Sequence, residues 1–321
     1  MSGAAARCGR PRSRRADGKL IAVVTQTQMV LEKQLTARGC LTPAFGRKGP
    51  ATQPRGLFFM QLDTDKIRAT SAGGIGTLVF NQPEKRNALS LEMWKGIGDA
   101  LAAFIAHPDI RLVVMRGAGG KAFISGADIS QFEERRSSES TAAEYNAITE
   151  RAWSGLSGLG KPLIAAIEGY CLGGGLAVAM KADIRIATKN STFGIPAARL
   201  GLAYPTDSVR DLVSLVGPSE AKRILFTGTQ FDAAIALRIG LINEIVENGA
   251  LDAAIAALAA ILTDNAPLSM RASKETVDQI ARGRVDVKRV NELAALCIES
   301  ADYAEGRRAF MEKRKPKFSG R

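Results

Sequence analysis

The sequence contains one histidine, four cysteines and no long apolar run. A single histidine, His107, argues against a histidine-based catalytic triad and against a His-rich metal site. The cysteines are widely separated and form no CxxC pair, as expected for reduced thiols in an intracellular protein. No stretch of about 18 uncharged apolar residues occurs, so we predict no membrane span.

Aromatic residues are also scarce, at 6% of the 321 residues, whereas alanine and glycine are abundant. The interior is therefore expected to depend on close backbone packing. Hydrophobic residues make up 46% of the chain, which is enough for one large domain or two small ones with a core.

Basic residues are concentrated at the N-terminus. Residues 1–59 hold eleven Lys and Arg against two acids, a net charge of +9, which leaves only +3 of the total +12 to the rest of the chain. A body near neutrality is not typical of a protein that binds phosphate backbones, so nucleic acid is not an expected partner. An RNA-binding side role of the basic segment is the alternative.

Residues 1–59 are rich in Arg, Pro and Gly and lack core-forming periodicity, so we predict a disordered basic extension. Three origins compete: a presequence, a basic tail, or an artefactual upstream start codon. The last is favoured because Met60 precedes the first regular segment. We expect a cytoplasmic protein, with a mitochondrial location as the alternative if the extension is a transit peptide.

Short apolar strands alternate with helices from Gly76 onward. Ser90 is placed to cap a helix whose apolar residues recur at helical spacing from Met93 to Ile105. The alternation predicts an α/β core over residues 60–250, followed by a helical region over residues 251–321. The predicted strands are Thr77–Asn81, Leu112–Arg116, Leu163–Ile167 and Ile184–Ala187, and the other predicted helices are Thr141–Leu159, Leu251–Asp264, Ala266–Ala281, Val287–Ser300 and Ala304–Lys313.

Two glycine-rich segments, at residues 125–128 (Ser-Gly-Ala-Asp) and 173–175 (Gly-Gly-Gly), each follow an apolar run and are expected to open a helix. Such turns expose backbone N–H groups. Two of them can direct two amides at one oxygen that becomes negative during a reaction. This main-chain oxyanion hole suits thioester chemistry. The alternative is that the glycines only permit tight turns and close packing.

Longer motifs surround these glycines, and together they resemble the crotonase family, also called the enoyl-CoA hydratase/isomerase family. The motifs are residues 85–89 (KRNAL), 122–129 (AFISGADI) and 161–175 (KPLIAAIEGYCLGGG), with further support from 182–184, 193–194, 225–228 and the tail 305–316. The resemblance implies a crotonase-like spiral of ββα turns with a C-terminal helical trimerisation region. It also implies an acyl-CoA substrate, a homotrimer or dimer of trimers, and no cofactor other than the substrate's coenzyme A.

The same resemblance assigns site residues. The amides of Ala127 and Gly174 would form the oxyanion hole around the thioester carbonyl. Ordinary surface positions are the alternative for the charged contacts, and Asp128 is also placed to fix its own turn. The implied CoA contacts are Lys85, Arg86, Ala88, Asp128 and Ile129, with Phe310 and Lys313 approaching the CoA of a neighbouring subunit.

Two departures from the family pattern concern proton transfer. Family hydratases carry one glutamate three residues past the central glycine of the triple-Gly motif, where this sequence has Ala177. A second glutamate follows the Phe-Gly-x-Pro element, where this sequence has Ala197. General acid–base groups contribute roughly 10²- to 10⁴-fold each, so the loss of both predicts slow hydration. The oxyanion hole is unaffected because its donors are backbone groups.

The segment after the second departure offers substitutes. Tyr204 matches a Tyr of crotonase-family methylmalonyl-CoA decarboxylases, and Asp207 follows it closely. The resemblance to those enzymes is partial, because they usually keep a glutamate at the first position. The structural alternatives are a buried ring with a hydrogen-bonded hydroxyl for Tyr204 and a helix N-cap for Asp207.

We therefore predict an acyl-CoA enzyme that works through an oxyanion-stabilised enolate, with decarboxylase-like lyase chemistry. One alternative is a hydratase or isomerase that uses Tyr204 or Asp207 in place of the glutamates. Another is a non-catalytic acyl-CoA-binding subunit.

Overall fold

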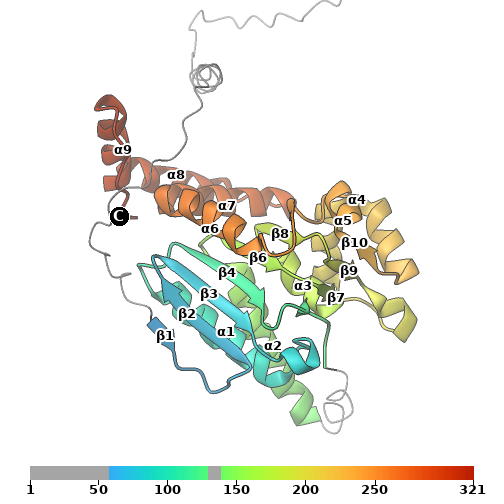
Figure 1. The fold of residues 1–321 in the computed structure, drawn as a ribbon. Coiled ribbons are helices and arrows are strands. Elements are labelled where there is room, and N and C mark those ends of the chain that lie inside the picture. Colours follow the sequence, from blue (N-terminus) through green and yellow to red (C-terminus); the bar gives the residue numbers. More distant parts are fainter. Residues whose placement is uncertain (1–57, 129–138) are drawn as a thin grey trace, which may run out of the picture. The chain divides into compact units, whose positions relative to one another are not determined.

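The computed structural model describes residues 58–128 and 139–321, which form two β-sheets and the helices around them (Figure 1). The predicted basic extension lies outside the described residues up to residue 57. The first described strand, β1, spans Phe58–Met60 and so begins two residues before the predicted start of the core.

The larger sheet of the described chain has seven strands in the order β1-β2-β3-β4-β6-β8-β11. β1, β2 and β3 are antiparallel, and the strands from β3 to β11 run parallel. Its inner strands are buried, as their continuous apolar sequences predicted. After β1, its members are β2 (Ile67–Ala72), β3 (Ile75–Phe80), β4 (Leu112–Gly117), β6 (Leu163–Ile167), β8 (Ile184–Thr188) and β11 (Glu244–Val246).

The smaller sheet has the order β10-β9-β7-β5. Each of its parallel strands follows a strand of the larger sheet along the chain and precedes a helical segment. The chain thus repeats a ββα unit, and the predicted α/β spiral is confirmed. Its members are β5 (Ala122–Ile124), β7 (Tyr170–Leu172), β9 (Thr192–Gly194) and the antiparallel β10 (Phe231–Asp232).

The helices of the core pack on these sheets. Helix α1 begins after Ser90, whose hydroxyl accepts a hydrogen bond from the Met93 N–H at 3.3 Å, so the predicted cap is confirmed. The Trp94 ring of α1 packs against the Trp153 ring of α2 in a tilted arrangement, with ring centroids 4.9 Å apart. Core helices are α1 (Leu91–Ala106), α2 (Glu139–Gly158), α3 (Gly174–Met180), α4 (Thr206–Thr227) and α5 (Ala233–Arg238), with short 3₁₀ turns η2 (Pro83–Lys85) and η5 (Pro196–Leu200).

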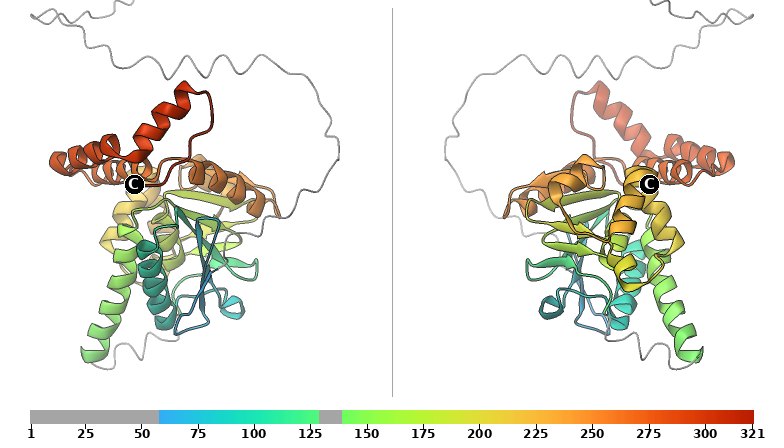
Figure 2. Two further views of the ribbon diagram at one scale, coloured as in Figure 1. Left: turned by 90° about the vertical axis from the view of Figure 1, so that its left-hand side faces the viewer. Right: turned by 90° about the vertical axis from the view of Figure 1, so that its right-hand side faces the viewer.

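The C-terminal region is helical, as predicted, and Figure 2 shows its red helices beyond the strands. It comprises α6 (Leu251–Asp264), α7 (Pro267–Ala281), α8 (Val287–Glu299) and α9 (Ala301–Met311). The predicted start of the last helix at Ala304 is wrong. Ser300 ends α8 and caps α9 by accepting from the Tyr303 N–H, so the two helices are separated by one residue.

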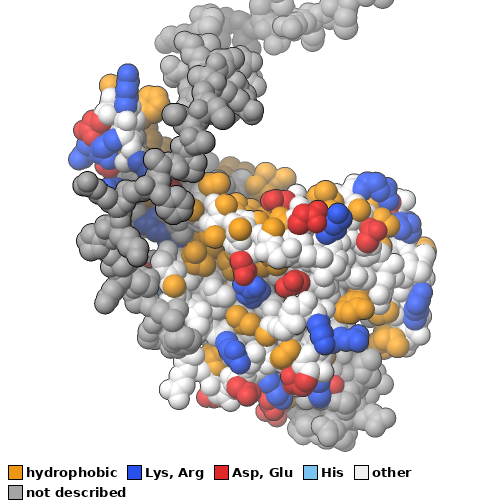
Figure 3. Space-filling model, in the orientation of Figure 1, with side chains coloured by type: hydrophobic (Ala, Val, Ile, Leu, Met, Phe, Trp, Pro, Cys, Tyr) orange, Lys and Arg blue, Asp and Glu red, His pale blue; other side chains and the backbone are white. Residues whose placement is uncertain are grey.

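The surface of the described residues carries charges of both signs. Figure 3 shows acidic and basic side chains interspersed on one face, as expected when the net charge outside residues 1–59 is small. No single helix in the described ranges has the length and apolar composition of a membrane span. Only α6 and α7 taken together, bent by 107°, pass that test.

Candidate active site

The triple-glycine motif joins β7 to α3, and its last glycine permits close packing. A Cβ at Gly175 would lie 2.3 Å from the carbonyl oxygen of Ile124 and 2.6 Å from its Cβ. Only glycine allows α3 to approach β5 this closely. Gly173 has φ 49° and ψ −119°, a conformation that residues with a side chain rarely adopt. The motif therefore places the start of α3 against the end of β5.

The two predicted oxyanion amides lie side by side. A carbon built at the Cβ position of Gly174 would be 3.8 Å from the Ala127 nitrogen. Leu89 donates to the Gly126 carbonyl at 2.8 Å and accepts from the Asp128 N–H at 2.9 Å. Because successive amides of an extended segment point to opposite sides, the Ala127 N–H points away from Leu89. Among the described residues, neither the Ala127 nor the Gly174 N–H has a hydrogen-bond acceptor.

The loop that contains the Lys-Arg-Asn-Ala-Leu motif is held by Asn87, which sequence analysis did not single out. Asn87 is fully buried and has φ 57°, a conformation that asparagine tolerates. Its side chain accepts from the Gln82 N–H and donates to the Ala118 and Ala122 carbonyls at 3.0 and 2.8 Å. The available sequence signal was an asparagine within a short polar loop.

The predicted CoA contacts divide between this loop and the segment after β5. Lys85 forms an ion pair of 3.0 Å with Asp128, and the Lys85 side chain is 51% exposed whereas that of Asp128 is 9% exposed. The Arg86 guanidinium lies over the Tyr170 ring. The backbone carbonyl of Arg86 accepts a hydrogen bond from the Ser125 N–H. Ala88 closes a turn of this loop, because its N–H donates to the Lys85 carbonyl at 3.1 Å. Ile129, and the helix expected to open there, lie outside the described residues.

The two positions where family hydratases carry glutamates are apolar here. Ala177 is buried on α3, one turn after Gly174, and its N–H donates to the Gly173 carbonyl at 3.1 Å. Ala197 lies in η5, partly buried against the main core. Neither side chain can transfer a proton.

Tyr204 and Asp207 have different environments. The Tyr204 hydroxyl donates to the Gly173 carbonyl at 2.9 Å, and burial raises the pKa of this phenol well above its ordinary value, with Cys171 and Asp211 adding to the shift. Asp207 is 75% exposed and pairs with Arg210 at 2.8 Å. The N-cap role offered as the structural alternative for Asp207 is wrong, because α4 begins at Thr206 and Asp207 lies within its first turn.

Phe310 and Lys313 are not brought near the two amides within one chain. Phe310 is 78% exposed near the end of α9, which contacts α8 and lies away from α3 in Figure 1. Lys313 follows the helix with φ 55°. The Asp302 carboxylate is buried at the start of α9 and accepts from the backbone N–H groups of Ser319 and Gly320. It holds the C-terminal tail.

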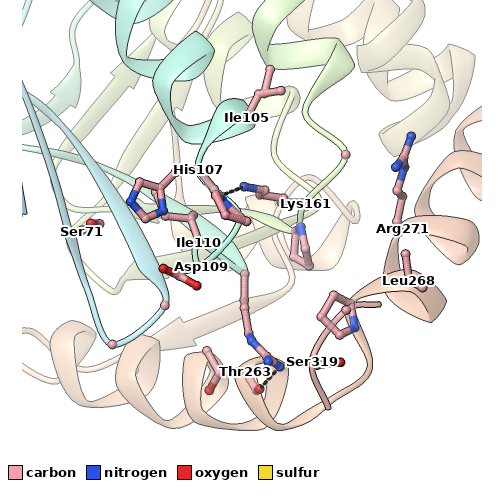
Figure 4. Close-up of a pocket in the computed structure, with 18 of the residues that line it drawn as sticks. Ser71, Ile105, His107, Asp109, Ile110, Lys161, Thr263, Leu268, Arg271 and Ser319 are labelled. Carbon is pink, nitrogen blue, oxygen red and sulfur yellow. Dashed lines mark hydrogen bonds between the residues drawn. The ribbon is translucent and has the colours of Figure 1, made fainter. Parts of the chain in front are cut away.

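A large cavity lies elsewhere. It has a volume of about 1030 Å³, and none of the predicted site residues line it. Figure 4 shows Lys161 pointing toward His107, whose carbonyl accepts from the Lys161 ammonium at 2.7 Å. Arg111, also on its wall, donates to the Thr263 and Phe318 carbonyls. Within the part of the chain that the structure describes, no cluster of three or more His, Cys, Asp or Glu side chains could hold a metal ion.

Comparison with known proteins gives the family. The model of the enoyl-CoA hydratase/isomerase family matches residues 70–321, most of the described chain. The chain belongs to this family. It is 34% identical over 246 residues to a crotonyl-CoA hydratase of Syntrophomonas wolfei, covering 76% of this chain and 94% of the relative. It is 31% identical over 264 residues to a carnitinyl-CoA dehydratase of Citrobacter koseri, covering 80% of this chain and 100% of that protein.

Solved structures of the enoyl-CoA hydratase/isomerase family have the same fold. An enoyl-CoA hydratase/carnithine racemase from Magnetospirillum magneticum superposes with a TM-score of 0.76 at 34% identity, over 81% of this chain and 97% of the other. A family protein from Hyphomonas neptunium has the same TM-score at 38% identity, over 81% and 100% of the two chains. The names of the relatives correspond to the hydratase alternative better than to a decarboxylase.

Proposed function

We propose that this protein activates an acyl-CoA thioester by binding its carbonyl oxygen between the N–H groups of Ala127 and Gly174. The observation that carries the proposal is the proximity of these two amides, both without an acceptor among the described residues. An enolate formed from the thioester places negative charge on that oxygen. Donors held in advance for developing charge lower the barrier, and one such donor is worth about 10²- to 10³-fold in rate.

The relatives favour hydration of an enoyl-CoA, or the reverse dehydration, as the reaction that uses this enolate. Addition of water at the β-carbon leaves the electron pair on the thioester, and a proton must then reach the α-carbon. Because Ala177 and Ala197 replace the two carboxylates, other groups have to transfer both protons. Tyr204 and Asp207 are the candidates for proton transfer that the sequence suggests. We expect this hydration to be slow.

Decarboxylation is the second candidate, and the two alanines favour it. When the bond to the carboxylate breaks, CO₂ leaves and its electron pair forms the enolate, so this step requires no base. Water then supplies the proton to the α-carbon. The buried Ala177 adds apolar surface one helical turn after Gly174, and an apolar environment favours loss of a charged carboxylate.

Coenzyme A contacts and assembly are part of the same proposal. Lys85 is half exposed while paired with Asp128, so its ammonium is accessible to a phosphate from solvent without breaking that ion pair. A homotrimer or dimer of trimers is the proposed assembly, since apolar Val277, Ile280 and Phe310 are each more than half exposed on the C-terminal helices. Light scattering of the full chain tests the assembly.

The proposal is tested with Gly174→Pro and Gly174→Ala. Proline suits the first position of a helix but has no N–H, whereas alanine keeps the N–H, and its Cβ would meet no atom nearer than 3.6 Å. Both variants and the unmodified protein are assayed on a panel of CoA esters for released CO₂, hydration and isomerisation.

We expect the proline variant to lose at least about 10²-fold in kcat while it still binds CoA esters, and the alanine variant to stay within a few-fold of the original. The product released identifies the reaction. Binding without turnover of any ester would support the non-catalytic alternative. Unchanged kcat in a folded proline variant would remove Gly174 from the mechanism.

A further inference from the structure

The Tyr204 side chain reaches the peptide group that carries one oxyanion donor. Its hydroxyl donates to the Gly173 carbonyl at 2.9 Å across 31 positions of sequence. That carbonyl and the Gly174 N–H belong to one peptide unit. Because the peptide unit is planar, a group that fixes the direction of the C=O also fixes the direction of the N–H.

Two hydrogen bonds constrain the Gly173–Gly174 peptide itself, and a third constrains the preceding Leu172–Gly173 peptide. The Gly173 carbonyl accepts from Tyr204 and from the Ala177 N–H at 3.1 Å, and the Gly173 N–H donates to the Gly194 carbonyl at 2.8 Å. Glycine at φ 49° has no side chain to limit its rotation. Of these three bonds, only the one from Tyr204 comes from a side chain, and so only that one can be removed by a substitution that preserves the backbone.

Donation to a carbonyl also polarises the amide to which it belongs. Hydrogen bonds in a chain strengthen one another by roughly 10–30% each in condensed-phase estimates. A Gly173 carbonyl that accepts two hydrogen bonds therefore makes the Gly174 N–H a stronger donor. The same geometry occupies the phenolic hydrogen, which would otherwise be available for proton transfer. Burial keeps that phenol protonated by raising its pKa.

We infer that Tyr204 is a positioning residue that orients and polarises the Gly173–Gly174 peptide, strengthening the Gly174 N–H as the donor to a thioester oxyanion. This inference rests on the proposed function. It differs from the assignment of Tyr204 as a general acid or base, because the tyrosine keeps its proton throughout and never contacts the reacting atoms.

Tyr204→Phe tests the inference, since it removes the hydroxyl and keeps the ring. A net hydrogen bond is worth about 0.5–1.5 kcal/mol, so we expect kcat to fall about 2- to 12-fold with little change in KM and no change in the shape of the pH profile. Loss of a general acid or base would instead cost roughly 10²- to 10⁴-fold and remove one limb of the profile. Tyr303→Phe, on the exposed surface of α9, is the matched control.

The infrared stretch of the bound thioester carbonyl supplies a second measurement. We expect it to shift to lower frequency in the unmodified protein, to shift less in Tyr204→Phe, and to shift further when a ring-fluorinated tyrosine, a stronger donor, replaces Tyr204. The fluorinated variant retains the hydroxyl and tests the inference even if Tyr204→Phe folds poorly.

Different results would overturn the proposed function and the role of Tyr204. A bound ester whose carbonyl shows no shift in the unmodified protein overturns the proposed function itself. A normal shift that is identical in all three proteins overturns the role of Tyr204 and leaves the proposed function intact. A loss of 10²-fold or more together with a lost limb of the pH profile shows that Tyr204 transfers a proton, which also overturns the inference.

Discussion

Gly175→Ala should displace the proposed oxyanion donor, the Gly174 N–H, without removing it. The added methyl carbon would lie 2.3 Å from the Ile124 carbonyl oxygen, a backbone atom of β5 that cannot rotate away. Helix α3 must then move off β5 by enough to restore an ordinary contact of about 3.4 Å or more, a displacement of the order of 1 Å. Ala127 follows β5 and Gly174 begins α3, so the two amides should separate.

The magnitude follows from that displacement. Overpacking of a core typically costs about 1–3 kcal/mol, which we expect in the free energy of unfolding measured in urea. A misplacement of about 1 Å can cost about 10²-fold in rate, so kcat should fall by more than stability alone explains at temperatures where the variant is folded. The assay is turnover of whichever CoA ester the panel identifies, at saturating substrate.

Gly158→Ala is the matched control. A Cβ at Gly158, the last residue of α2, would meet no atom within 4 Å. The same chemical change there should leave kcat unchanged and alter stability by no more than about 1 kcal/mol. If Gly175→Ala behaves like Gly158→Ala in both measurements, close packing of α3 on β5 does not set the geometry of the site and the reasoning is refuted.

Three further outcomes are expected. Ala177→Glu combined with Ala197→Glu should raise the rate of crotonyl-CoA hydration above that of the unmodified protein, if the pocket accepts the added volume and charge. A hydration rate of about 10 s⁻¹ or more in the unmodified protein would contradict the prediction that it hydrates slowly. Asn87→Ala should lower the free energy of unfolding by about 1–3 kcal/mol, because buried partners lose hydrogen bonds, and a negligible loss in urea titration would contradict the account of that loop. Lys85→Ala should weaken calorimetric binding of a CoA ester several-fold, less so at high salt, and unchanged affinity would exclude Lys85 from the CoA site.

Local signals in the sequence were sufficient for most elements of the fold. Leu163–Ile167 and Leu251–Asp264 were predicted with the observed bounds, because an uninterrupted apolar run and a long amphipathic stripe are each set by neighbouring residues. The start of α9 was missed because Ser300 serves two helices at once. The two-residue β10 depends on pairing with β9 and has no periodicity of its own.

Part of the candidate site could also be predicted from local sequence, and part could not. Glycines at 126 and 173–175 indicated exposed amides, and the structure brings Ala127 and Gly174 together through the parallel pairing of β5 with β7. The partner of Tyr204 could not be predicted, since it depends on a contact between segments that are distant in the sequence. The three-fold use of the Asn87 amide depends likewise on tertiary structure.

The centre of the proposed site consists of backbone N–H groups, which every amino acid except proline possesses. Ala127 is already alanine, and the space beside Gly174 accepts a methyl group. A conventional alanine scan would therefore detect no loss of activity at Ala127 and Gly174. It would instead detect losses at surrounding side chains such as Asn87 and Tyr204. Variation of the side chains at positions 177 and 197 would then change which reaction the proposed enolate undergoes, while the backbone donors that stabilise it stay the same. Mutational maps of this protein should be drawn with proline and amide-to-ester replacements, which reach the backbone directly.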